Sequence, residues 1–254
     1  MLKKQRQKRH FQTEWQSMLA CQEVFCRTRK PEALHRFRVQ VKKIKALLHY
    51  LQGISTPGPV STLQSLFKQA GRVRSAHISV QLMRQYQMTN EVLMAKLEQT
   101  GKDGAQQFQM QSGNSADTLQ RLYKSLNSAF SDKSDKSVLQ LCQKRLKRLA
   151  RPDKIITNLH KARKQIKELL YFHDVLPKAI VRKLHLNTTY LRQLEETIGK
   201  WHDIISIIQL LESEEVADLN MIARLGRRRK RLFVSIHGLA GQFAGNAVYR
   251  ALDD

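Results

Sequence analysis

Apolar residues recur along most of the chain at intervals of three and four positions, the spacing of one helix face. No segment sustains the strict apolar–polar alternation typical of a half-buried strand. The pattern predicts helices at residues 7–29, 31–50, 62–88, 90–110, 117–130, 137–150, 152–174, 187–211 and 217–244. We therefore predict an all-α protein.

Breaks in the pattern suggest how these helices are grouped. The segment ISTPGPVST (54–62) is rich in Pro, Gly and Ser and predicts a loop. QSGNSAD (111–117) is polar and is the best linker candidate. We expect a single domain over 1–254, made of two antiparallel four-helix bundles. The N-terminal half is 7–111 and the C-terminal half is 115–247.

Two of the predicted helices carry the same basic signature, His-x-x-Arg-x-x-x-Lys. It comprises His35, Arg38 and Lys42 in the first half, and His160, Arg163 and Lys167 in the second. A second similarity follows each copy, because LFKQAGRVRSAHISVQLM (66–83) aligns with LEETIGKWHDIISIIQLL (194–211) and brings Gly71 onto Gly199. The same order and nearly the same spacing indicate that the two halves arose by internal duplication.

The cationic residues are concentrated rather than spread. The formal net charge is +24, and residues 1–52, 141–170 and 222–231 together account for all of it. Charge of one sign gathered in this way attracts a partner of the opposite sign. The candidate partners are nucleic acid, inorganic polyphosphate and an anionic lipid surface.

The signature residues form stripes. On a helix turning about 100° per residue, His35, Arg38, Lys42, Lys45 and His49 lie within an arc of roughly 80°. A solvated helix face usually mixes Glu with Lys, but residues 33–52 contain no acid. We therefore favour polyanion binding over a merely solvated face. The dense runs KRLKR (144–148) and GRRRKR (226–231) have the same character, but each alone is weak evidence.

Other chemistry finds less support. The odd set of Cys21, Cys26 and Cys142 contains no Cys-x-x-Cys pair, which argues against a disulfide framework or structural zinc and favours a reducing cytosol. His35 and His160 lack acidic or thiol companions, so we expect no metal and no cofactor there. Packing and ligand contact both remain open for these histidines. No apolar run approaches membrane-spanning length, so we expect a cytoplasmic protein without membrane insertion.

The duplicated signature, with a Gly-containing helix after each copy, resembles the CHAD family (conserved histidine α-helical domain). The resemblance implies a basic groove or pore between the two bundles, binding of inorganic polyphosphate without catalysis, and association with polyphosphate granules. By position it implies contacts from His35, Arg38, Lys42, Lys43, Lys45, His160, Arg163, Lys164 and Lys167. From the aligned glycine helices and the basic runs we add Arg72, Arg74, Arg148, Lys200, Arg224, Arg227, Arg228 and Arg231.

The chain departs from the family pattern at two points. The family has an acid soon after the glycine, which the second half keeps as Asp203 and the first half replaces with Ser75. Glu168 also stands where the first copy has Lys43, so the two half-sites are unequal.

Two other functions compete with polyphosphate binding. Binding to RNA or DNA is the alternative, although the stripes hold no aromatic residue on which bases would stack. A polyphosphate hydrolase is disfavoured, because such chemistry needs carboxylates that hold a divalent metal.

Overall fold

A computed structural model describes residues 1–52, 61–88, 90–213 and 219–248 of the 254-residue chain. Regular structure in this described part is helical, apart from two isolated bridging pairs, Leu2–Lys133 and Leu186–Val248. The chain divides into two compact units. The N-terminal unit is Lys3–Ser131, and the C-terminal unit combines residues 1–2 with the chain from Asp132 onward.

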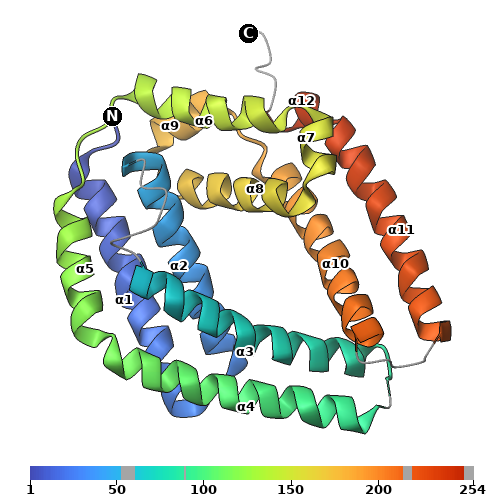
Figure 1. The fold of residues 1–254 in the computed structure, drawn as a ribbon. Coiled ribbons are helices and arrows are strands. Elements are labelled where there is room, and N and C mark those ends of the chain that lie inside the picture. The colour runs from blue at the N-terminus through green and yellow to red at the C-terminus, as the bar shows by residue number, and fades with distance from the viewer. Residues whose placement is uncertain (53–60, 89, 214–218, 249–254) are drawn as a thin grey trace. The chain divides into compact units, whose positions relative to one another are not determined.

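The N-terminal unit is built from helix pairs. Its helices are α1 (Lys4–Thr28), α2 (Pro31–Gln52), α3 (Ser61–Gln85), α4 (Glu91–Asn114) and α5 (Ala116–Ser128). Helix α1 packs along α2 and α3 packs along α4, while α2 also contacts α3 (Figure 1). Phe108 of α4 joins these pairs, since its ring packs edge-on against Phe25 of α1 and Phe37 of α2. Helix α5 belongs to the same unit, because Tyr123 stacks on Phe11 of α1 at 5.5 Å.

The C-terminal unit combines long and short helices. They are α6 (Asp135–Leu149), α7 (Pro152–Thr157), α8 (Leu159–His173), α9 (Lys178–Leu184), α10 (Thr188–Ser213), α11 (Leu219–Gly241) and α12 (Phe243–Asn246). Helix α10 packs against both α8 and α11. Near its start, the buried Tyr190 donates its hydroxyl hydrogen to the carbonyl of Leu239 on α11. Burial raises the pKa of Tyr190 to about 12, so this donor stays protonated at neutral pH.

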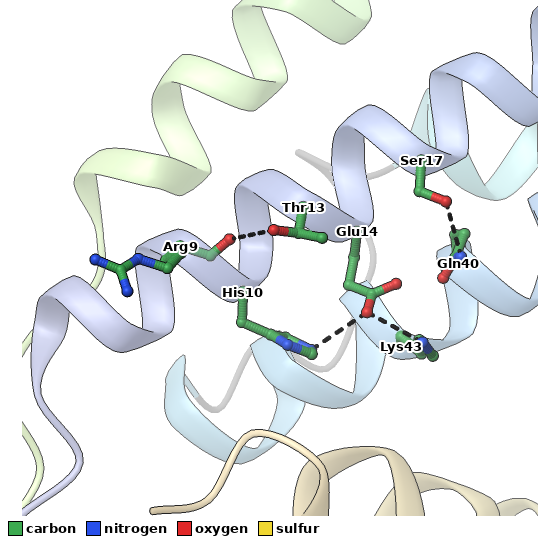
Figure 2. A network of polar contacts seen from close by, with 7 residues as sticks. All are labelled: Arg9, His10, Thr13, Glu14, Ser17, Gln40 and Lys43. Carbon is green, nitrogen blue, oxygen red and sulfur yellow. Dashed lines mark hydrogen bonds and ion pairs between the residues drawn. The ribbon is translucent and has the colours of Figure 1, made fainter.

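Polar side chains also hold α1 against α2 (Figure 2). Lys43 of α2 lies 3.0 Å from the carboxylate of Glu14, whose side chain is only 9% exposed. His10, one turn earlier on α1, reaches the same carboxylate at 3.8 Å. A buried carboxylate is costly unless it is paired. Lys43 therefore contributes to packing inside this unit, whatever else it does.

Most helices begin and end close to their predicted bounds, with three differences. The predicted linker at 111–117 is wrong, because α4 continues through Ser112 and Gly113, and α5 begins at Ala116. The single helix predicted for 152–174 is broken at Asn158, whose side chain caps α8 through the Lys161 amide. Helix α9 was not predicted. The predicted loop at 54–62 lies almost wholly outside the described residues.

Two other predictions can be compared with the described residues. Cys21, Cys26 and Cys142 are all free thiols, as expected from their odd number and spacing. Among the helices of the described part, none is both long enough and apolar enough to cross a lipid bilayer.

Candidate functional site

The signature arginine of the N-terminal unit lies on a glycine of the next helix. A Cβ atom added to Gly71 of α3 would come within 2.6 Å of Nη1 of Arg38 on α2. The same Nη1 donates to the carbonyl oxygen of Phe67 at 2.5 Å. Only a residue without a side chain lets the guanidinium approach the α3 backbone this closely. We call this contact the glycine seat.

The ring of Phe67 lies beneath the cations of this stripe. The guanidinium carbon of Arg38 is 4.1 Å from the ring centroid, and the ammonium nitrogens of Lys42 and Lys45 are 6.0 Å and 5.7 Å away. Cations over an aromatic face are attracted by its quadrupole. Lys45 also donates to the Gln64 side chain at 2.5 Å. The three cations are thus gathered over one aromatic ring.

Burial and, to a smaller extent, the charge of nearby Arg74 together lower the pKa of Arg38 to about 10. The guanidinium is still protonated at neutral pH. A lowered pKa means that the charged form is poorly solvated where it lies. An external anion would therefore stabilise it.

The C-terminal unit contains a second glycine seat, in which the arginine has a different neighbouring side chain. A Cβ atom on Gly199 of α10 would come within 2.6 Å of Nη2 of Arg163 on α8. Here Nε of Arg163 donates to Glu195 at 2.7 Å, and the ammonium of Lys167 lies 3.1 Å from the same carboxylate oxygen. The Glu195 side chain is 11% exposed. The two signature cations of this unit therefore share one internal counter-charge.

Glu195 and Phe67 occupy corresponding positions, four residues before Gly199 and Gly71 respectively. In one unit this position supplies a negative charge to the stripe, and in the other it supplies a neutral ring. The surroundings of the two stripes therefore also differ at this position, on which the expectation of unequal half-sites did not rest.

The signature histidines lie at the surface. His35 and His160 are both exposed near the starts of α2 and α8, so neither is packed in a core. The rings of His160 and His202 are 5.6 Å apart. Burial lowers the pKa of His202, and the neighbouring His160 and Arg163 lower it further, while Asp203 acts in the opposite direction. His202 corresponds to Arg74 in the other unit, so a titratable group stands where the first half has a permanent cation.

Several predicted site residues lie away from the seats. Lys43 points to α1 and Glu14, roughly 120° around α2 from the stripe at 100° per residue. Lys164 is exposed and lies 3.9 Å from Glu168 on its own helix. Arg72 and Lys200 are exposed one position after the seat glycines.

The remaining predicted residues lie on other helices. Arg224, Arg227, Arg228 and Arg231 are all exposed and share one face of α11, within an arc of roughly 100°. Arg148 belongs to a separate basic cavity beside α6.

Four partners of the cations were not predicted from the sequence, namely Phe67, Gln64, Glu14 and Glu195. Phe67 and Glu195 could have been found, since the alignment of 66–83 with 194–211 already superposes them. The stripe also has an aromatic neighbour after all, contributed by α3 rather than α2. Arg38 lies over one face of this ring, and Phe67 is half-buried.

No group of three or more His, Cys, Asp or Glu residues in the described ranges is arranged to hold a metal ion.

The family of the chain is decided by its match to a family model. The model of the CHAD domain matches residues 9–212. The chain belongs to the CHAD family. A comparison with curated protein sequences gives no match. Among solved structures, the chain resembles the crystal structure of the CHAD domain from the plant Ricinus communis, with a TM-score of 0.65 and 14% identity. The likeness covers 93% of this chain and 91% of that chain, so the helical CHAD fold extends over nearly the whole molecule.

The glycine seat predicts an unusual effect on stability. Replacing an interior helix glycine with alanine normally stabilises by about 1 kcal/mol. Gly226→Ala on α11 should show this gain, because nothing lies within 4 Å of its added Cβ. Gly199→Ala should show none and should unfold more easily than the wild type, because the methyl group displaces Arg163 from Glu195. Urea denaturation followed by circular dichroism measures both variants. Equal stabilisation of the two would show that the seat does not constrain Arg163.

Proposed function

We propose that this protein binds inorganic polyphosphate through the cations gathered at its two glycine seats. The observation that most favours this is the row of Arg38, Lys42 and Lys45 gathered over the one neutral ring of Phe67. Gathered cations repel one another, so a chain of phosphates lying along them stabilises the whole group. Membership in the CHAD family supports the same ligand class.

The two units contribute to this binding in related ways. Arg38 on Gly71 and Arg163 on Gly199 are the same contact made twice, at positions that the sequence repeat aligns. This supports a pair of helical bundles derived from one duplicated unit. We propose that each half presents one basic stripe to the polymer, and that the first half binds more strongly because Glu195 neutralises part of the second.

We also propose that the protein binds polyphosphate without hydrolysing it, in the cytoplasm, where it would associate with polyphosphate granules. The carboxylate of Glu195 already contacts Arg163 and Lys167, so it is poorly placed to hold a divalent metal. Release of orthophosphate from polyphosphate in the presence of Mg²⁺ or Mn²⁺ would contradict this part of the proposal.

The proposal is tested directly by removing stripe lysines while both seated arginines are kept. The stripe variant Lys42→Gln, Lys45→Gln and Lys167→Gln should bind long-chain polyphosphate at least tenfold more weakly. The control variant Lys102→Gln, Arg121→Gln and Lys124→Gln removes the same charge from exposed positions of the N-terminal unit and should lose less than threefold. Titration calorimetry at fixed salt measures both, because counterion release makes such affinities depend on salt.

A competition experiment shows whether polyphosphate or nucleic acid is the preferred ligand. RNA is added to the polyphosphate complex at matched phosphate concentration and ionic strength. We expect polyphosphate to displace RNA and not the reverse. If RNA displaces polyphosphate, or if the stripe variant and the control variant lose affinity equally, the stripes are not a polyphosphate site.

Phe67 and Glu195 each lie four residues before a seat glycine. Substitutions at these two positions should change the affinity for polyphosphate in opposite directions. Glu195→Gln removes the internal counter-charge of Arg163 and Lys167, so affinity for polyphosphate should rise about threefold or more. Phe67→Glu places a carboxylate beneath the first stripe and should lower affinity by at least as much. Both variants are measured in the same binding assay, with helicity checked by circular dichroism. A fall in affinity for folded Glu195→Gln would mean that the carboxylate organises the site rather than weakening it.

The lowered pKa of His202 predicts that polyphosphate binding becomes stronger at acidic pH. In the free protein its pKa lies below the ordinary value of 6.5, so it is neutral at pH 7.5. A bound polyanion favours the imidazolium and raises this pKa, so binding takes up a proton and affinity increases as pH falls towards 5.5. His202→Gln should flatten this dependence, whereas His237→Gln on the exposed face of α11 should not. Identical pH profiles for wild type and His202→Gln would contradict the expectation.

A further inference from the structure

A second concentration of cations surrounds a cavity that lies wholly within the C-terminal unit. The cavity measures about 1300 Å³ and is bounded by α6, α7 and the start of α8. Among the described residues, seven Lys or Arg side chains line it, and no Asp or Glu does. They include Lys144, Lys147 and Arg148 from α6, Arg151 and Lys154 from the start of α7, and Lys161 from the first turn of α8.

This cavity is separate from the stripe on the same helix. Lys161 and Gln165 line the cavity, whereas His160, Arg163 and Lys167 form the stripe. At 100° per residue the two groups lie roughly 150° apart around α8. Arg163 also faces Gly199 on α10, which contributes nothing to the cavity wall. A ligand in the cavity therefore contacts different side chains from one on the stripe.

The cavity cations also differ in their partners from the stripe cations of the same helix. Arg163 and Lys167 are both neutralised by the carboxylate of Glu195. Among the described residues, the side chains of Lys144, Lys147, Arg148 and Lys161 make no hydrogen bond or ion pair with any other residue. Arg151 reaches only the exposed Asp153, at 3.6 Å. No described residue therefore neutralises these four side chains, and an external anion would stabilise them.

The start of α8 adds to the positive field. Lys161 lies in the first turn of α8, which contains no acid. A helix N-terminus carries a partial positive charge, so a cation there is unfavourable and an anion is favourable. An anion in the cavity would contact Lys161 and also stabilise the end of the helix.

The lining indicates the kind of anion. The cavity is larger than a single phosphate needs, since typical sites for drug-sized ligands measure about 300–1000 Å³. The apolar residues of its described lining are Leu149 and Ala162, and none of the described lining residues is an aromatic on which a base could stack. We infer that the cavity between α6, α7 and α8 binds a compact soluble anion with several phosphate groups and no nucleobase. This site goes beyond the proposed stripe and does not depend on it.

Calorimetry with the full chain tests the inference, with inorganic tripolyphosphate and inositol hexakisphosphate as probes. The cavity variant Lys144→Gln, Arg148→Gln and Lys161→Gln should bind both at least tenfold more weakly. Glutamine keeps good helix propensity and these side chains have no internal partner, so circular dichroism should show an unchanged fold. The control variant at Lys102, Arg121 and Lys124 should change affinity less than threefold, and the stripe variant should lose less affinity than the cavity variant.

Adenosine triphosphate serves as a third probe in the same calorimetric experiment. It should bind no more tightly than tripolyphosphate. Tighter binding by tenfold would show base recognition and overturn the ligand class. The inference is also overturned if wild type binds neither probe, if the control loses as much as the cavity variant, or if only the stripe variant loses binding. If the wild type binds tripolyphosphate but not long-chain polyphosphate, the stripe proposal fails and the inference about the cavity stands.

Discussion

The arrangement of each basic stripe depends on an arginine seated on a glycine. A guanidinium that approaches a helix backbone this closely fixes the spacing between its own helix and the next, α2 with α3 in one unit and α8 with α10 in the other. Once Arg38 is fixed, the helix repeat places Lys42 one turn further along the same face. The seat thus converts a sequence signature into a defined row of charges, and it explains why a glycine follows each copy at nearly the same distance.

The residue four positions before the glycine determines how each row is neutralised. A ring at Phe67 attracts the cations without cancelling their charge, whereas the carboxylate of Glu195 cancels part of it. The first arrangement leaves a stripe that gains most from an external anion. The second is stable by itself and gains less. Two halves with the same helices can therefore differ in affinity through a single position.

The sequence predicted the helices well because their apolar periodicity is long and strong, and it predicted the stripes because periodicity also determines which residues share a face. It failed where one residue overrides the pattern. Asn158 breaks a periodic segment by capping α8, and Gly113 fails to end α4 although glycine often ends a helix. The partners of the cations were missed because Glu14 and Phe67 lie on neighbouring helices, and helix pairing does not follow from periodicity.

Two groups of cations in this chain contrast with one another. Those on Glu14 and Glu195 are neutralised by the fold itself, and their positions are held by it. Around the cavity of α6, α7 and α8, the side chains of Lys144, Lys147, Arg148 and Lys161 have no such partner among the described residues, so their mutual repulsion opposes folding of the C-terminal unit in the absence of ligand. A fold that keeps such a group loses some stability in exchange for a strong external field. That exchange is expected of a surface that binds an anion, and it distinguishes the cavity from residues that merely keep the protein in solution.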